Sequence, residues 1–442
     1  MVQGGDYTPK RLYKAFMALL VGLFHISCET TDPTGWRTPK ESSNTSLTDL
    51  FNRTQRNDHI AMFQIGWRFD TGTGGVKQDF REAAGWYRLS AERGNYSMAK
   101  NNLGCLYRDG RGVIQNFKMA ATLFRESSEL GNPHGKKNLG ILYERGYGVQ
   151  INYPEALRLY TEAATETKDY AGDPVAQNNL GCLYLDGKGT KPDPFTAIKW
   201  FRKSANQNCG LGHQNLGHIY ELGDELGVDI KKDIHKALQH YKTASDSGNV
   251  YAMNAIASLF REGRSVPQNH AKALEYYKMA ANKGYAVGVF NLATMHLEGK
   301  GVEADPIKAA EWMLKAAAKG NALAQYKYAW MLEKGIGIRR NLEEAIKWYQ
   351  KSADQGWGPA QLELGMLLGA GAESGIPDSV NAYKWLQLAA EWNNVGAIAI
   401  LPKIAEEMTP AQILEAKDLA VNFVARPTME EIYVEPPPSS VK

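Results

Sequence analysis

Residues 176–205 have the sequence AQNNLGCLYLDGKGTKPDPFTAIKWFRKSA. This order of small, bulky and glycine residues occurs nine times in all along the 442-residue chain. Each repeat contains a glycine or alanine, here called the marker, that is followed 16 to 20 residues later by another alanine. A period of 36 to 41 residues predicts a repeat array in which each unit packs on its neighbours. The nine markers are Gly66, Gly104, Gly140, Gly181, Gly217, Ala257, Ala293, Ala329 and Gly365.

Each repeat is predicted to form two helices joined by a turn. Around the marker, apolar and small residues follow one another at spacings of one, three and four, which places them on one buried helix face. Four residues before the second alanine stands an aspartate or asparagine, such as Asp193 before Ala197. These side chains accept hydrogen bonds from the free amides at a helix start, so a second helix begins there. Glycines such as Gly187 and Gly189 lie between the helices, where a turn needs positive φ angles.

The pattern A-x-x-x-L-G-x-x-Y-x-x-G-x-G-V, followed by Asp/Asn-x-x-x-A-x-x-W-Y-x-x-A-A, resembles the Sel-1-like repeat family, whose members are relatives of tetratricopeptide repeats. The resemblance covers residues 58–393 and implies an all-α fold, a right-handed α-solenoid of about nine helix-turn-helix repeats. Within 394–425, the sequence from Thr409 to Gln412 and the apolar residues after it predict a C-terminal capping helix that covers the open end. The proline-rich tail 426–442 is predicted to be disordered.

The N-terminal region predicts export from the cytoplasm. Basic residues precede a short apolar run at 15–24, which is about half the length needed to cross a bilayer, so residues 1–28 have the layout of a cleaved signal. The end of this segment resembles a bacterial lipobox, which implies a lipid on Cys28, although His25 replaces the usual leucine. The alternative is a cytoplasmic protein that begins with a short helix. Residues 29–57 are rich in Thr, Ser, Pro and Asn and predict a flexible spacer.

Composition and motifs argue against several functional classes. The net charge is only +3, from 51 Lys and Arg against 48 Asp and Glu, and no basic block occurs, so no nucleic-acid partner is expected. The chain has no P-loop, HExxH helix, GxSxG elbow or EF-hand loop, which predicts a protein that is not an enzyme and has no cofactor. The fifth repeat could offer a zinc or copper site, but packing and helix capping explain its residues better, and no metal is predicted. Its four histidines are His213, His218, His235 and His240.

The first helices are expected to line the concave side of the array and to form a groove that binds a partner. Positions three and two before the marker, and one after it, point away from the buried face at 100° per residue. Asparagine recurs there and can hold a peptide main chain, or else it bonds the backbone of the adjacent repeat. Aromatic residues at the two ends of the array, Phe63, Trp67, Tyr326 and Trp330, are candidate anchors or core residues. The predicted groove residues are Asn101, Asn102, Asn138, Asn178, Asn179, Gln214, Asn215, His218, Asn254, Asn291, Tyr326 and Trp330.

These observations predict a scaffold that binds a protein or peptide in the groove. The predicted location is the bacterial envelope, in the periplasm or on a membrane through a lipid on Cys28, and the oligomeric state stays open. One alternative is a cell-wall or β-lactam-acting enzyme, as in cysteine-rich relatives, whose paired cysteines this sequence lacks. Another is a quality-control adaptor of the eukaryotic endoplasmic reticulum, where a large adaptor carries similar repeats.

Overall fold

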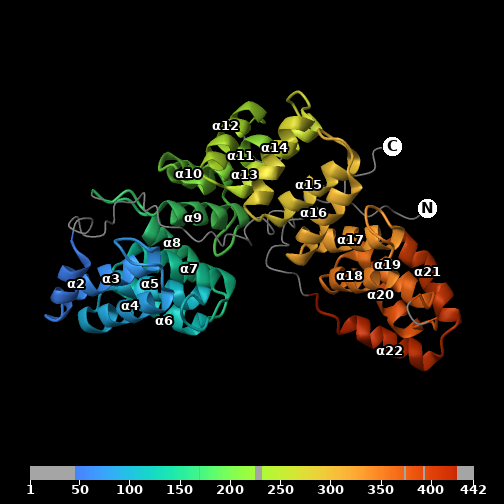
Figure 1. Ribbon diagram of the computed structural model, residues 1–442, viewed down its shortest axis with the longest axis horizontal. Coiled ribbons are helices and arrows are strands. Elements are labelled where there is room, and N and C mark those ends of the chain that lie inside the picture. The colour runs from blue at the N-terminus through green and yellow to red at the C-terminus, as the bar shows by residue number, and fades with distance from the viewer. Residues whose placement is uncertain (1–44, 169, 224–230, 373–374, 392–393, 426–442) are drawn as a thin grey trace. The chain divides into compact units, whose positions relative to one another are not determined.

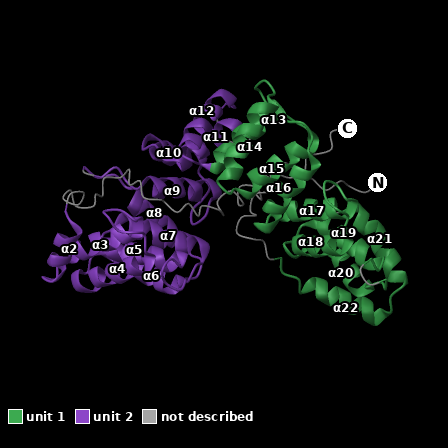
Figure 2. Ribbon diagram, in the orientation of Figure 1, with its two compact units in different colours: residues 1–23, 250–442 green, residues 24–249 purple. Residues whose placement is uncertain are grey.

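The structure of the protein is a computed structural model. Its regular structure is α-helical throughout the described residues, apart from one isolated bridge between Thr167 and Tyr170, which confirms the predicted all-α solenoid (Figure 1). The described residues form two compact units: unit 2 contains those from 45 to 249, and unit 1 those from 250 to 425 (Figure 2). The described residues are 45–168, 170–223, 231–372, 375–391 and 394–425.

Unit 2 contains a short leading helix, α2 (Leu47–Thr54), and five helix pairs, in which each helix packs on the one that follows it. The first helices of these repeats are α3 (His59–Thr71), α5 (Ser97–Asp109), α7 (Pro133–Arg145), α9 (Pro174–Asp186) and α11 (Gly210–Leu222). The second helices are α4 (Phe80–Gly94), α6 (Phe117–Glu129), α8 (Tyr153–Ala164), α10 (Pro194–Asn206) and α12 (Ile234–Asp246).

Unit 1 contains four helix pairs and two further helices at its C-terminal end. The first helices are α13 (Val250–Glu262), α15 (Ala286–Glu298), α17 (Ala322–Lys334) and α19 (Gly358–Gly369). The second helices are α14 (His270–Asn282), α16 (Pro306–Ala318), α18 (Leu342–Asp354) and α20 (Ser379–Glu391), and α21 (Val395–Glu406) and α22 (Pro410–Val421) both pack on α20.

Capping residues and glycines fix the helix ends as the sequence predicts. Asp193 accepts a hydrogen bond from the Thr196 amide at 3.0 Å, and the predicted Asp or Asn caps the second helix in the same way in all nine repeats. Gly187 ends α9 with φ 69°. Gly189 has φ 74° and lies against the preceding repeat, where an added Cβ would come within 2.6 Å of the Tyr153 carbonyl oxygen. A larger residue there would push adjacent repeats apart.

The small marker residue exists because an aromatic ring of the second helix packs against it. A Cβ at Gly181 would lie 2.7 Å from Cε1 of Phe201, and one at Gly140 would lie 2.7 Å from Cε1 of Tyr160. Phe201 and Tyr160 are both fully buried. The two helices of a repeat can therefore approach closely only where the first helix carries a small residue, which explains the period seen in the sequence.

The structure corrects the predicted spacer. Residues 47–54 form α2, whose first turn is capped by the Ser46 hydroxyl, which accepts from the Asp49 amide at 3.1 Å. Leu50 is fully buried and packs with Ala61 and Ile65 of the first repeat. The prediction of a flexible spacer is therefore wrong for this helix, because one buried leucine gives a short polar segment enough contact to order it. Residues 29–44 lie outside the described residues, as do the predicted signal 1–28 and the tail 426–442.

The C-terminal end contains the predicted capping helix together with a helix that the sequence analysis does not identify. The Thr409 and Gln412 side chains cap α22 reciprocally, as the sequence predicts. The additional helix α21 precedes it, contains Pro402 and has only Ala397 fully buried. None of the helices in the described part of the chain is both long and apolar enough to cross a bilayer.

Candidate protein-interaction surface

The asparagines of the predicted groove bond to one another across repeat boundaries. The Nδ2 atom of Asn138 donates to Oδ1 of Asn101 at 2.8 Å, which joins α7 to α5. Asn215 donates to Asn178 in the same way at 2.8 Å, and so does Asn291 to Asn254, again at 2.8 Å. These bonds lie where the first helices of adjacent repeats contact each other directly, in the pairs α5–α7, α9–α11 and α13–α15. The amides join the array together and are largely buried.

This arrangement differs from both interpretations that the sequence left open. The acceptor Asn178 has no exposed surface, and its partner Asn215 is half-buried. The amide groups that were predicted to hold a peptide main chain are thus engaged side chain to side chain, and the backbone of the adjacent repeat is not their partner. The donor nitrogens also contact a thiol 3.6 Å away, Cys182 for Asn215 and Cys105 for Asn138. Burial raises the pKa of both thiols, which fits packed and unreactive cysteines.

Two other groove asparagines hold a buried tyrosine of the preceding repeat. Nδ2 of Asn102 lies 3.2 Å from the Tyr87 hydroxyl oxygen and donates to it. The Asn179 side chain bonds the Tyr160 hydroxyl in the equivalent position. Because both tyrosine rings are fully buried, these amides complete the hydrogen bonding of the core.

Each of these hydroxyls also donates to a carboxylate four residues after the marker. Tyr160 donates to Glu144 at 2.7 Å, and Tyr87 donates to Asp70 at 3.0 Å. Two further pairs, Tyr241 with Glu221 and Tyr349 with Glu333, have the same geometry at 2.7 and 2.9 Å. Burial raises the pKa of Glu144 and Asp70, while the tyrosine donor opposes that rise.

Where the second helix carries phenylalanine, the carboxylate is absent. Leu185 stands in that position opposite Phe201, and Arg108 stands there opposite Phe124. Tyr277 is an exception, because Arg261 stands in that position and the Tyr277 hydroxyl bonds Ser258 at 2.9 Å. In the other repeats with a tyrosine, the match between hydroxyl and carboxylate is visible once the repeats are aligned, although it was not predicted. It avoids a buried carboxylate that would have no donor.

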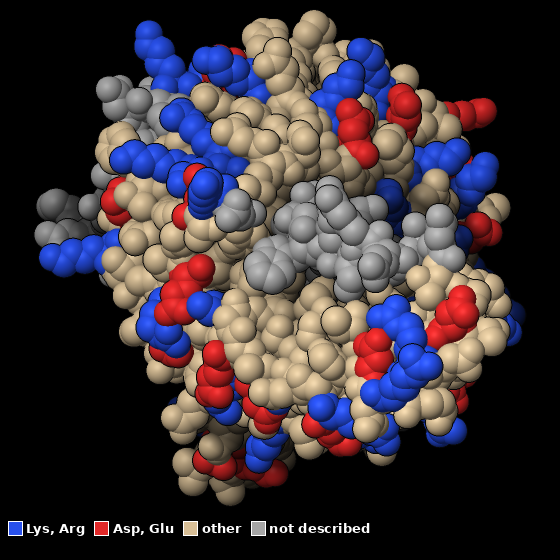
Figure 3. Space-filling view, turned by 90° about the vertical axis from the view of Figure 1, so that its left-hand side faces the viewer, with Lys and Arg blue, Asp and Glu red and all other residues tan. Residues whose placement is uncertain are grey.

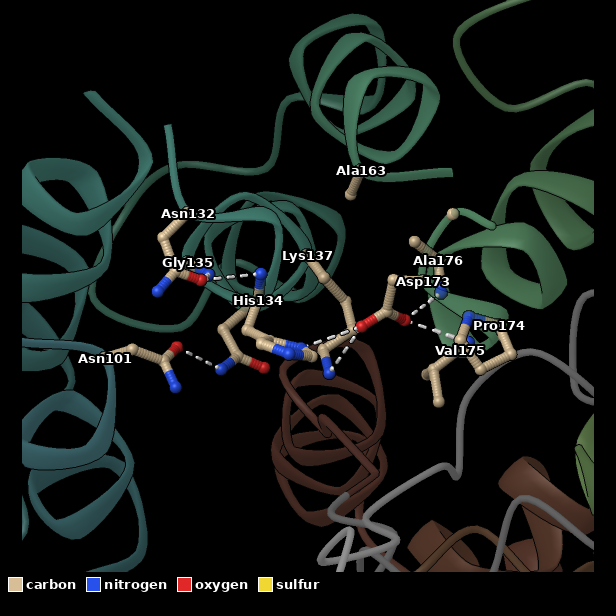
Figure 4. Close-up of polar contacts among 12 residues, drawn as sticks. Asn101, Asn132, His134, Gly135, Lys137, Ala163, Asp173, Pro174, Val175 and Ala176 are labelled. Carbon is tan, nitrogen blue, oxygen red and sulfur yellow. Dashed lines mark hydrogen bonds and ion pairs between the residues drawn. The ribbon is translucent and has the colours of Figure 1, made fainter. Parts of the chain in front are cut away.

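A buried ion pair joins the third and fourth repeats in place of an asparagine pair. Asp173 caps α9 by accepting from the amides of Val175 and Ala176 at 2.9 and 2.8 Å. His134 and Lys137 of α7 both point at its other oxygen, at 2.9 and 3.3 Å (Figure 4). Lys137 and the amide bonds hold the pKa of Asp173 far below its usual range, despite burial. This contact was not predicted, because Asp173 follows the insertion in the fourth repeat.

Two of the four histidines in the fifth repeat come together. Nδ1 of His213 lies 3.0 Å from Nδ1 of His240, and the ring of Tyr220 stacks on His240 with centroids 5.6 Å apart. Burial lowers the pKa of both imidazoles, so the pair is neutral near pH 7. His218, a predicted groove residue, is half-buried on α11. Across the part of the chain that the structure describes, no three His, Cys, Asp or Glu residues are placed to hold a metal ion.

The predicted anchors Tyr326 and Trp330 lie on one face of α17, and both are half-buried. Glu333 continues that face one turn later, and the Tyr326 ring lies 5.7 Å from the ring of Tyr349. The Lys327 ammonium is 5.6 Å from the Tyr326 ring centroid and 5.7 Å from that of Trp330. The face is therefore partly open, aromatic and bordered by charge.

The first repeat carries the same order of residues on α3. Phe63, Trp67 and Asp70 occupy the positions of Tyr326, Trp330 and Glu333, and Trp67 is half-buried like Trp330. Phe63, however, is almost fully buried and packs edge-on against Tyr96 at 5.2 Å. Phe63 is therefore a core residue, and Trp67 is the partly open aromatic side chain at this end.

The remaining groove residue, Gln214, is also bonded to another side chain. Its Oε1 accepts from Nδ2 of Asn249 at 2.9 Å, and its side chain is buried.

On the face shown in Figure 3, Lys and Arg lie side by side with Asp and Glu. Several of these charges are paired along a helix, such as Lys347 with Glu343 at 2.6 Å. Cys28, the predicted lipidation site, lies outside the described residues.

Comparison with known families identifies the repeats. The model of the Sel1 repeat matches nine consecutive segments, 59–95, 97–132, 134–167, 174–209, 212–249, 250–285, 286–321, 322–357 and 358–392. The chain belongs to the Sel1 repeat family. Proteins of this family typically act as scaffolds for protein–protein interaction, and the fold is typically non-catalytic.

A solved structure of a Sel1 repeat protein shares the fold. A Sel1 repeat protein from Oxalobacter formigenes is 24% identical, with a TM-score of 0.52, over 82% of this chain and 95% of that one. A protective antigen of uropathogenic Escherichia coli strains, which displays an SLR fold, is also 24% identical, with a TM-score of 0.41 over 86% and 94% of the two chains. Comparison with curated proteins gives no match.

Proposed function

We propose that this Sel1 repeat protein is a scaffold that binds a protein or peptide partner through the first helices of its repeats. The observation that carries the proposal is the half-buried aromatic face of α17, formed by Tyr326 and Trp330. Large aromatic side chains that are held rigidly but remain partly open commonly supply most of the energy of a protein interface. Trp67 on α3 offers a second contact of the same type.

The asparagine pairs support the interface indirectly. Their amides already bond one another, as Asn291 does with Asn254, so they have little to offer a partner's main chain. Their contribution is to fix the spacing of the first helices, which carry the aromatic side chains. In this proposal the partner contacts aromatic rings on a rigid array, and the buried amides do not touch it.

The test is affinity capture from the native source with a tagged full-length chain. The variant Tyr326→Ala/Trp330→Ala should lose specific partners, while Ile307→Ala should retain them. Ile307 is a suitable control because it is 65% exposed on α16, away from the first-helix face. Circular dichroism must show equal helicity for both variants. An unchanged set of captured proteins with Tyr326→Ala/Trp330→Ala would refute the role of this face.

We also propose that the protein is exported, and that Cys28 carries a lipid. Support comes from the order of residues before Cys28, in which positive charge, an apolar run and small residues follow one another. Mass spectrometry of the mature N-terminus tests this. A chain that starts at a diacylated Cys28 would support the proposal, and a chain that retains Met1 would refute export and favour a cytoplasmic scaffold.

A further inference from the structure

The junction between the eighth and ninth repeats breaks the pattern of asparagine pairs. At three earlier junctions, the residue three positions before one marker bonds the residue two positions before the next marker. At this junction the two positions are occupied by Tyr326 on α17 and Glu363 on α19. Among the described residues, Glu363 has no hydrogen-bond or ion-pair partner, although it is only half-exposed. A position that serves to join repeats elsewhere here presents an unpaired carboxylate.

A second carboxylate makes this an electrostatically unfavourable place for a negative charge. Glu333 of α17 lies near Glu363, and burial together with the like charge of Glu333 raises the pKa of Glu363, although Lys334 opposes that rise. Glu333 itself is engaged, because it accepts from the Tyr349 hydroxyl at 2.9 Å and pairs with Lys334. Lys334 also attracts Glu363, but its ammonium is paired with Glu333, so Glu363 is the carboxylate of the two that has no hydrogen bond or ion pair among the described residues. A further cation beside Glu363 would offset its repulsion with Glu333.

The aromatic rings beside this carboxylate already receive a cation from the chain itself. The ammonium of Lys327 lies 5.6 Å from the centroid of Tyr326 and 5.7 Å from that of Trp330. A cation within about 6 Å of a ring centroid is attracted by the negative face of the ring. These two rings are thus suited to a positively charged group, and Lys327 shows that one can reach them.

The first repeat supplies a natural comparison. It has the same face, with Trp67 and Asp70 in place of Trp330 and Glu333. The residue that corresponds to Glu363 there is Asn102, whose amide donates to the Tyr87 hydroxyl at 3.2 Å. The two ends of the array therefore share the half-buried tryptophan and differ in the unpaired carboxylate.

We propose that the α17–α19 junction binds a lysine or arginine side chain of an extended partner segment. In this site the carboxylate of Glu363 pairs with the cation, and the rings of Tyr326 and Trp330 contact its apolar stem and its charge. The inference rests on the proposed function and assigns the chemistry of the partner at the same face. Basic segments are preferred over acidic ones because Glu363 and Glu333 together repel a carboxylate.

Fluorescence anisotropy with the full-length protein and two labelled peptides tests the site. The probes are fluorescein-labelled Gly-Ser-Leu-Arg-Arg-Leu-Ser-Gly and the same peptide with glutamate in place of both arginines. The arginine peptide should bind about tenfold more tightly, and Glu363→Gln should remove most of that difference, since a charge-assisted hydrogen bond contributes on this scale. Glu363→Arg should reverse the preference, while Ile307→Ala, which changes a residue of α16 that is 65% exposed, should leave it unchanged. Equal binding of both peptides, or no effect of Glu363→Gln, would overturn the proposal.

Capture of native partners separates this inference from the proposed function. If Trp330→Ala loses the partners and Glu363→Gln retains them, the scaffold role is supported and the cation site is refuted. If both variants lose the partners and retain their helicity, both proposals are supported. If both variants retain every partner, the aromatic face is not the interface, and both proposals fail.

Discussion

The bond between Asn178 and Asn215 should stabilise the junction of the fourth and fifth repeats measurably. Asn215→Ala removes the 2.8 Å donor of an acceptor that has no exposed surface. A buried acceptor that loses its partner costs about 1–3 kcal/mol. In a repeat array this loss acts locally, so we expect the free energy of opening of α9 and α11 to fall by about 2 kcal/mol. Amide hydrogen exchange in these two helices should then be about 30 times faster.

A double-mutant cycle isolates the bond from other effects of the substitutions. Asn178→Ala combined with Asn215→Ala should cost less than the two single changes added together, by about 1 kcal/mol, because both ends of the bond are removed at once. The control is Asn291→Ala, which breaks the equivalent bond to Asn254 and should speed exchange in α13 and α15 instead. Additive effects in the cycle, or unchanged exchange in α9 and α11, would show that the amide bond does not hold the junction.

Three further results are expected. Burial lowers the pKa of His213 and His240, so the unfolded chain binds more protons than the folded chain below pH 6.5, and stability should fall as the pH drops through 6.5. In thermal melts, His240→Phe should weaken this pH dependence. An unchanged pH profile would contradict the role of the histidine pair. Tyr160→Phe leaves the buried Glu144 carboxylate without its donor and should lower the free energy of unfolding in urea by about 1–3 kcal/mol. The double variant Tyr160→Phe/Glu144→Leu copies the natural pair of the fourth repeat and should recover most of this loss. Asp173→Asn removes the buried carboxylate that His134 and Lys137 both contact and should cost about 3 kcal/mol in the same assay, and a loss below about 1 kcal/mol would show that the ion pair contributes little.

The helix pairs were predictable because a few strong local signals agree in every repeat. Asp193 and its equivalents mark the start of each second helix. The marker must be small because a ring of the second helix packs against it. Residue types at single positions were sufficient for these predictions. In contrast, α2 depends on one leucine in a polar segment, and α21 depends on packing against α20, so neither gives a periodic signal of its own.

The hydrogen-bond partners of the predicted groove residues could not be predicted from one repeat at a time. Asn178 and Asn215 lie 37 residues apart and were assigned the same role, since nothing within a repeat distinguishes a free amide from a paired one. The distinguishing signal is a longer period: asparagine with cysteine four residues later occurs at Asn101 and returns 77 residues on at Asn178. Comparison of alternate repeats would have revealed it. Binding by Tyr326 and Trp330 stays a prediction.

The alternation of junctions has a consequence for how such an array can change in length. The boundary between the second and third repeats is closed by two amides, and the next boundary is closed by Asp173 with His134 and Lys137. Excising the fourth repeat alone would place Lys137 opposite Asn215, which bonds an asparagine in the intact protein. Excising the third repeat alone would place Asp173 opposite Asn101. Excising the third and fourth repeats together would instead place Asn101 opposite Asn215, which restores a pair of asparagines. In this part of the array the exchangeable unit is thus a pair of repeats, which spans 77 residues from Gly104 to Gly181.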